Sequence, residues 1–159
     1  MAITKRVTTI IAFLCAAISP PVFAHDDGFY LGVEAGYALV DNVPGGVTSN
    51  AAGRALGGYQ FNPYFAVEVG VLGNLNNLYI VDGVVRATLP FTNETRIFIK
   101  AGYAEIVNNS FDEIFNTFTY GAGFGIGVTG PFSVDIGYQG YGDERRVDFI
   151  SLGFSYHLY

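Results

Sequence analysis

The sequence predicts an all-β protein: an eight-stranded antiparallel up-and-down transmembrane β-barrel, preceded by a cleavable signal peptide. Three observations lead to this prediction. Apolar and small or polar residues alternate along eight segments, the more apolar face of each segment lacks charge at its centre, and the first 24 residues have the composition of a secretory signal. A period of two is typical of strands, and an uncharged apolar face on every strand fits a barrel wall in contact with lipid.

The signal peptide is indicated by three consecutive features at the amino terminus. Lys5 and Arg6 precede an apolar run over residues 7–18, and a Ser-Pro-Pro break then leads to small residues suited to cleavage after Ala24. Such a signal has a basic start, an apolar centre and a small-residue cleavage site, and this run is shorter than the roughly 20 residues that a membrane helix needs. We therefore expect His25 to begin the mature protein. The predicted domains are a signal peptide over 1–24 and an outer-membrane β-barrel over 25–159.

Composition restricts the remaining possibilities. Half of the residues are apolar, 14 are Phe, 11 are Tyr and 21 are Gly. No later stretch has the unbroken apolar length of a membrane helix, and glycine spread among alternating segments is typical of tightly curved β-walls. The formal net charge of −6 argues against nucleic acid as a partner, because nucleic-acid binding demands a basic surface. Cys15, the only cysteine, lies in the predicted signal, so no disulfide is expected in the mature chain.

Eight segments of alternating character are separated by turn residues. Asn62, Pro90 and the Gly130-Pro131 pair mark short turns, and more polar stretches lie between the other segments. The expected strands are residues 29–40, 52–61, 65–72, 78–89, 96–107, 117–128, 132–139 and 150–159.

The alternation also predicts which face of each strand points outward. In the last strand Ile150, Leu152, Phe154 and Leu158 share one face, and small or polar residues share the other. A soluble barrel of lipocalin type is the alternative, and it would turn its larger apolar residues inward around a ligand. Here charges and glycines occupy the less apolar face throughout, so the apolar face is predicted to be the outer one.

An even number of strands returns the chain to its starting side, which gives an expected orientation in the membrane. Both termini and the three short turns should face the periplasm. The more polar connections should face the outside of the cell. These connections are residues 41–50, 74–77, 108–116 and 142–146.

Three segments carry a family resemblance. The hairpin between the second and third expected strands resembles that of the OmpA-type transmembrane barrel, and the fifth strand resembles its counterpart there. The ending is similar to the signal Gly-x-x-aromatic-x-hydrophobic that the barrel-assembly machinery reads in this class; Gly153, Tyr156 and Leu158 match it, and Tyr159 extends one residue beyond. The other matching segments are Gly57-Gly58-Tyr59-Gln60-Phe61-Asn62-Pro63-Tyr64 with Glu68 and Gly70, and Lys100-Ala101-Gly102-Tyr103.

The resemblance covers the whole mature chain and implies a small outer-membrane barrel, closer in size to the OmpX and opacity-protein relatives. The chain departs from the family in two further respects. It contains no Trp, so Tyr and Phe alone must form the bands of aromatic residues at the membrane interfaces. No peptidoglycan-binding domain follows the barrel, so the cell-wall anchoring of full-length family members is not expected.

The less apolar faces carry a set of charged residues. A barrel of eight strands is just wide enough for side chains to fill its interior, so these charges must pair or stay hydrated. The resemblance implies a mid-barrel cluster of carboxylates and bases, whose expected carboxylate on the seventh strand is matched only loosely, by Asp135 near Gly137. Two interpretations stay open: a structural polar plug, or a gate for a narrow water or ion path. The seven charges are Glu34, Arg54, Glu68, Asp82, Arg86, Lys100 and Asp135.

An enzymatic function was also considered, because some eight-stranded outer-membrane barrels modify lipid A. Such chemistry needs a nucleophile and a histidine near the outer leaflet, with a group that orients the histidine. Ser155 and His157 share a strand face, yet they lie at the periplasmic end of the last strand, and no acid in the alternation is placed to orient His157. We therefore expect no catalytic residues and no cofactor.

The external segments are where contacts with other molecules are expected. Phe111, Ile114 and Phe115 either contact a host surface or another protein, or fold onto the rim beside lipopolysaccharide. Arg145 and Arg146 are candidates for contact with lipopolysaccharide phosphates, and the acidic residues of these segments have no metal-site spacing.

The predicted function is therefore a monomeric, non-enzymatic barrel with a role in envelope integrity, adhesion or host-surface contact. The alternative is a narrow water or ion pore. Expected partners are outer-membrane lipids and lipopolysaccharide, with the Sec translocon, signal peptidase and the barrel-assembly machinery during biogenesis.

Overall fold

The structure is a computed structural model, and it describes residues 28–43, 46–74, 78–92, 94–108, 113–142 and 146–158. The predicted cleavage site at Ala24 and His25, Cys15 and the last residue, Tyr159, lie outside the described residues. Within these ranges, no helix is long and apolar enough to cross a membrane.

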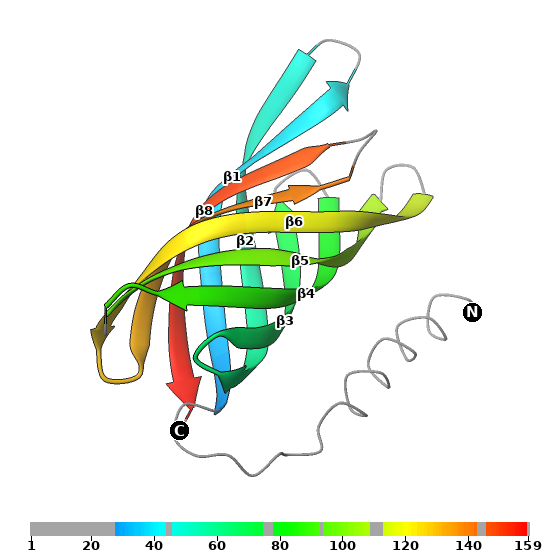
Figure 1. Cartoon of the computed structure of the whole chain (residues 1–159). Helices are drawn as coiled ribbons and strands as arrows, with labels where there is room; N and C mark the ends of the chain where they lie inside the picture. The colour runs from blue at the N-terminus through cyan, green and yellow to red at the C-terminus, as the bar shows by residue number, and fades with distance from the viewer. Residues whose placement is uncertain are drawn as a thin grey trace.

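Eight antiparallel strands form one closed barrel in simple sequence order (Figure 1). The first and last strands complete the closure, with pairs running from Phe29 opposite Leu158 to Val40 opposite Val147. Closure leaves the wall without an open edge, and the predicted up-and-down barrel is confirmed. The strands are β1 (Gly28–Val43), β2 (Gly46–Asn62), β3 (Phe65–Asn74), β4 (Leu78–Pro90), β5 (Thr95–Asn108), β6 (Glu113–Thr129), β7 (Phe132–Tyr141) and β8 (Val147–Leu158).

Three hairpins extend further than the sequence predicted. In one of them β7 runs to Tyr141 and β8 begins at Val147, past the expected ends at 139 and 150. Residues 41–50 were expected to form a loop, but all except 44–45 belong to β1 and β2, which still pair at Val43 and Gly46. Part of the expected loop 108–116 is likewise strand, because Glu113 begins β6 and pairs with Asn108 of β5. Antiparallel strands satisfy their backbone groups through each other, so a polar hairpin continues beyond the apolar wall without needing a buried face.

The two ends of the barrel differ in their connections. At one end, here called the turn end, the strands join through Pro63–Tyr64, residues 91–94 and Gly130-Pro131. The Asn62 side chain accepts hydrogen bonds from the backbone N–H groups of Tyr64 (2.8 Å) and Phe65 (2.9 Å), and Gly130 has a φ of 60° that favours glycine. The opposite end, here called the loop end, holds the connections around 44–45, 75–77, 109–112 and 143–145.

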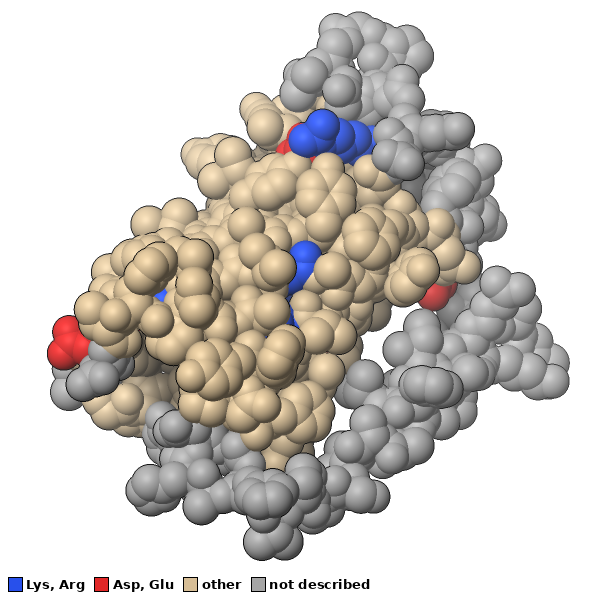
Figure 2. Space-filling model, viewed as in Figure 1, with Lys and Arg blue, Asp and Glu red and all other residues tan. Residues whose placement is uncertain are grey.

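The outward face of the wall is apolar, as the alternation predicted. Ile99 (63% exposed), Ile136 (59%) and Leu152 (58%) are examples from three strands. Uncharged residues make up most of the wall visible in Figure 2. A wall that exposes this much apolar area is suited to contact with lipid and not to contact with water.

Aromatic rings form a band near each end of the outward face. At the turn end the rings of Phe132 and Phe154 lie 5.4 Å apart between centroids. At the loop end Tyr103 and Phe118 meet edge to face at 5.9 Å. Bands of this kind are typical of the two interfaces of a membrane, and the chain builds them without Trp.

Glycine at inward positions leaves room for the large side chains of the interior. A Cβ atom at Gly70 of β3 would lie 2.5 Å from Nε of Arg54, whose side chain is fully buried. Gly83 of β4 points outward and has no neighbour within 4 Å of such an atom. A substitution at Gly70 adds atoms to a crowded interior, whereas the same substitution at Gly83 only places a β-branched residue in a strand. Comparing the two positions therefore isolates the effect of crowding.

We expect Gly70→Val to destabilise the barrel by about 1–3 kcal/mol, the usual cost of forcing extra atoms into a packed interior. Gly83→Val is the matched control and should leave stability unchanged or slightly raised. Urea-dependent unfolding in lipid vesicles measures both. Equal stability of the two variants would show that Arg54 is not held where the structure places it.

Candidate functional site

The inward side chains form three layers along the barrel axis. An apolar cluster lies at the loop end, charged residues fill the middle, and a pocket opens at the turn end. The period of two brings one inward residue from each strand to every level. The structure places all seven predicted charges in the middle layer, where ion pairs join them into one network.

Arg54 of β2 is the centre of the first group of pairs. Its guanidinium binds Asp82 of β4 through two hydrogen bonds, Nε to Oδ2 at 3.0 Å and Nη2 to Oδ1 at 2.5 Å. It also lies 3.3 Å from Oε1 of Glu34. Tyr141 donates a hydrogen bond to Asp82 Oδ2 at 2.9 Å. Arg54 and Asp82 have no exposed side-chain area, so each charge depends on its partner.

Glu68 of β3 is the centre of the second group. Lys100 Nζ lies 2.8 Å from its Oε2 atom and Arg86 Nη1 lies 3.1 Å from its Oε1 atom. Tyr30 donates to the same Oε1 at 2.8 Å. Lys100 is also 3.5 Å from Oε1 of Glu34, so this lysine connects the two groups.

Arg96 of β5 is a member that the sequence analysis missed. Its Nη2 atom lies 3.0 Å from Oδ1 of Asp135, whose Oδ2 atom is 3.3 Å from Nη1 of Arg86. The alternation could have revealed it, because Arg96 is two residues before Phe98 and four before Lys100. Residues at this spacing share one face of a strand. With Arg96, the ion-paired interior of the described chain has four carboxylates and four bases.

The ring of Phe98 lies against two cations of the middle layer, Arg86 and Lys100. The guanidinium carbon of Arg86 lies 3.7 Å from the centroid of the Phe98 ring, and Lys100 Nζ lies 5.3 Å from it. A cation over a ring face gains electrostatic attraction without a further acid. Phe98 is buried on the inward face of β5.

At the loop end the lumen is closed by apolar side chains. Leu72, Ile80, Tyr141 and Phe149 have no exposed area. The Tyr141 hydroxyl donates to Asp82. Two further buried polar side chains lie at this level, where Gln139 donates to Thr119 at 3.1 Å and Thr119 donates to the Gly140 carbonyl at 2.9 Å. A water or ion path through this end would therefore have to displace buried side chains. The cluster consists of Ala38, Ala52, Leu72, Ile80, Ala104, Ile106, Tyr141, Val147 and Phe149.

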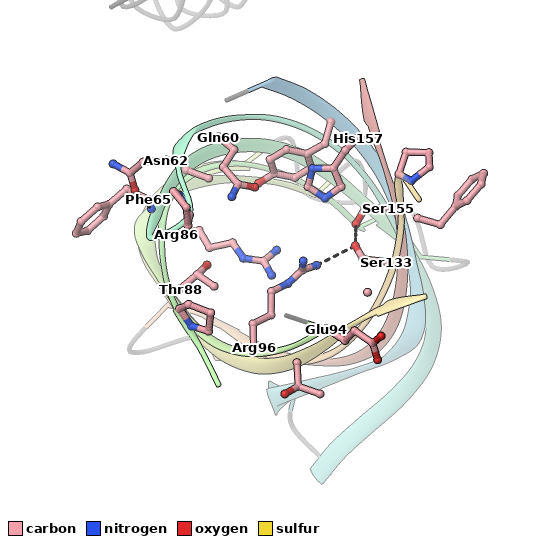
Figure 3. Close-up of a pocket in the computed structure, with 18 of the residues that line it drawn as sticks. Gln60, Asn62, Phe65, Arg86, Thr88, Glu94, Arg96, Ser133, Ser155 and His157 are labelled. Carbon is pink, nitrogen blue, oxygen red and sulfur yellow. Dashed lines mark hydrogen bonds between the residues drawn. The ribbon is translucent and has the colours of Figure 1, made fainter. Parts of the chain in front are cut away.

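At the turn end the lumen opens into a pocket of about 280 Å³, shown in Figure 3. Arg86 and Arg96 lie at its inner side, and Ser133, Ser155 and His157 line its wall. We call this space the turn-end pocket. Among the described residues, no group of three or more His, Cys, Asp or Glu is placed to hold a metal ion.

The pair Ser155 and His157 lies in this pocket, at the turn end where the sequence analysis expected it. Ser155 Oγ is 2.6 Å from Ser133 Oγ, and the His157 ring stacks on Tyr30 with 5.1 Å between centroids. Both side chains are thus engaged in contacts that pack the wall.

The segment that resembles an assembly signal forms the end of β8. Gly153 points inward opposite Glu34 of β1 and Asp135 of β7. Tyr156 and Leu158 are exposed on the outward face. Tyr159 lies outside the described residues.

We expect Asp82→Ala to destabilise the barrel by about 3–5 kcal/mol, because it leaves the fully buried Arg54 without its bidentate partner. Glu34→Ala removes a longer contact to the same arginine from a carboxylate that keeps some exposure, and should cost less. Urea unfolding of both variants in lipid vesicles provides the comparison. A larger loss for Glu34→Ala would contradict the assignment of Asp82 as the main partner of Arg54.

Comparison with known proteins agrees with the fold. A structure of Neisserial surface protein A is similar over 82% of this chain and 97% of its own, with 19% identity and a TM-score of 0.62. Ail, the attachment invasion locus protein of Yersinia pestis, matches 83% of this chain and 99% of its own, at 14% identity and a TM-score of 0.62. A de novo designed transmembrane β-barrel matches 86% of this chain and 100% of its own, at 15% identity and a TM-score of 0.61.

The likeness to a designed barrel shows that the shared architecture alone says nothing about function. No curated protein matches this sequence significantly. The family model described as outer membrane protein beta-barrel domain matches residues 8–157. The chain therefore belongs to the outer-membrane protein β-barrel family.

Proposed function

We propose that this protein is a non-enzymatic barrel that stabilises the outer membrane and presents its loop end for contact with other surfaces. The observation that carries the proposal is the filled interior. The charges of the middle layer are paired with each other, and apolar side chains close the loop end. A lumen of this kind serves as a rigid support, so contacts with other molecules come from the rim and the external segments.

A narrow water or ion pore is the second candidate, and it was the alternative from the sequence. The turn-end pocket favours it, because this pocket reaches inward as far as Arg86. Conduction also requires a polar path through the loop end, where Leu72, Ile80 and Phe149 are fully buried against each other. Opening would have to displace these apolar side chains as well as break ion pairs.

We expect wild-type protein to show no conductance in planar bilayers, and Glu68→Ala to be equally silent. Glu68 holds Lys100 and Arg86, so a gate made of these ion pairs would respond to its removal. Single-channel recording of both proteins distinguishes the candidates. Discrete openings that change in frequency or size in Glu68→Ala would favour the gated pore.

The outward rim at the loop end provides a contact site for lipopolysaccharide. Arg146 donates through Nε to Asp148 at 2.8 Å and through Nη2 to the Tyr138 hydroxyl at 2.9 Å, and Tyr138 donates to Asp148 at 2.6 Å. The hydrogen bond to Asp148 contributes most to a raised pKa of Arg146, so this cation stays charged. An exposed arginine beside a band of aromatic rings is suited to the phosphates of a lipid headgroup.

The external segments provide the second kind of contact. Ile114 and Phe115 belong to β6, in the part that extends the β5–β6 hairpin, whereas Phe111 lies outside the described residues. A hairpin that extends beyond the wall is a place where contact with another surface is expected. The proposed orientation has this end outside the cell and both termini in the periplasm.

An enzymatic role in lipid A modification receives no support from the site. Ser155 is hydrogen-bonded to Ser133, and His157 is stacked on Tyr30, at the end that the proposed orientation places in the periplasm. A change in the lipid A mass spectrum upon expression of the protein would contradict the non-enzymatic proposal.

A protease site inserted at residues 109–112 tests the placement of the loop end. We expect cleavage on intact cells there, and protection of the same site inserted after Gly130 until the outer membrane is broken. Heat-dependent electrophoretic mobility confirms that both variants form barrels. Cleavage at 109–112 only from inside would reverse the orientation.

A replacement of the same connection tests surface contact, with the insertion after Gly130 as its control. Replacement of residues 109–112 by Gly and Ser should reduce adhesion of expressing cells to host-cell layers, while the insertion after Gly130 leaves it unchanged. Unaltered adhesion after the replacement would leave only the envelope role.

A further inference from the structure

The turn-end pocket has a chemical character that the proposed function does not use. It is open to solvent, has a volume of about 280 Å³, and is lined by both arginines that contact Asp135. Most of the other polar groups that line it are hydroxyls or amides that donate hydrogen bonds, from Gln60, Thr88, Ser133 and Ser155. The pocket therefore combines two guanidinium groups with hydroxyls and amides that can donate as well as accept.

The acids that balance these arginines are turned away from the pocket. Both oxygens of Asp135 are occupied, Oδ1 by Arg96 and Oδ2 by Arg86, and Asp135 is not part of the lining. Glu68, the other partner of Arg86, is 1% exposed. Glu94 is the one acid of the lining, and it lies in the connection between β4 and β5 at the open side. A molecule that has passed Glu94 meets the guanidinium groups of Arg86 and Arg96 before it meets Asp135 or Glu68.

The two guanidinium groups lie side by side at the centre of the lumen in Figure 3. Hydrogen bonds to the pocket wall fix the position of Arg96. Its Nη2 atom donates to Ser133 Oγ at 2.8 Å, and Ser133 Oγ is hydrogen-bonded to Ser155 Oγ at 2.6 Å. The Nε atom of Arg96 is buried and has no hydrogen-bond partner among the described residues. Because Nε is buried, an anion in the pocket would meet the terminal nitrogens of this guanidinium and not Nε.

We propose that the turn-end pocket binds a small oxoanion, a carboxylate or a phosphate, through Arg96 and Ser133 with Arg86 at its inner side. Planar guanidinium groups bind two oxygens of such an anion at once, and hydrogen bonds that involve a charge are stronger than neutral ones. The hydroxyl groups of the wall supply further donors. In the proposed orientation the pocket opens to the periplasm, so the anion is either dissolved there or is the free carboxyl terminus of a peptide.

The test is calorimetric titration of the full barrel, refolded in detergent micelles, with inorganic phosphate, with acetate, and with a short peptide that has a free or an amidated carboxyl terminus. We expect saturable binding of one anion per barrel. Binding of phosphate and acetate identifies a dissolved anion. Binding of the free peptide that is tighter than that of acetate and is lost on amidation identifies a tethered carboxylate. No binding of any probe overturns the proposal.

Arg96→Gln should weaken binding by about tenfold or more, the effect of losing one charge-assisted hydrogen bond. Glu105→Gln is the control, because it removes a charge from the same strand near the loop end, outside the pocket lining, and should leave binding unchanged. Equal affinity of wild type and Arg96→Gln, or an equal loss in the two variants, contradicts a specific site.

A third variant tests the pocket without removing any charge. Thr88 is an inward residue of the pocket wall, two positions from Arg86 on β4. Thr88→Phe fills the space in front of the guanidinium groups and should abolish binding while the barrel keeps its heat-dependent mobility. Retained binding in folded Thr88→Phe would place the anion elsewhere.

Discussion

The mutual pairing of buried charges is the constraint on which the rest of the structure depends. Eight strands enclose a lumen that side chains must fill, and an unpaired charge there costs several kcal/mol. Arg54 with Asp82, and Glu68 with Lys100, meet at distances of 3.0 Å or less. Glycine opposite these large side chains, as at Gly70, and aromatic partners such as Tyr30 follow from the need to accommodate them.

This constraint gives the two ends of the barrel different properties. The loop end continues the interior with apolar side chains and is closed. Near the turn end two arginines share one carboxylate, Asp135. Guanidinium groups therefore face the open side of the barrel. The same charge network therefore borders a closed apolar end on one side and a pocket lined by two arginines on the other. Figure 1 shows that the β1–β2 hairpin extends beyond the wall at the loop end.

The fold could be predicted almost completely from the sequence, and the site only in part. Strand number, order, closure and the outward face follow from a period of two, which each segment repeats. The ends of the strands at 41–43, 46–50 and 113–116 were wrong, because polar composition does not distinguish a loop from a hairpin that pairs in water. Arg96 was missed because it is the first residue of its expected strand. At the end of a strand the alternation does not distinguish an inward side chain from one in solvent.

Seven of the eight ion-paired interior charges could be assigned to the inward face from the sequence, because parity along a strand fixes the side of the wall on which each residue lies. Which of these charges meet depends on the arrangement of the strands in space. Arg86 and Asp135 are 49 residues apart, and Tyr141 and Asp82 are 59 apart. Contacts across a lumen depend on the stagger between strands and on how the barrel closes, and no local pattern records either quantity. The turn-end pocket, lined by residues from all eight strands, has the same origin.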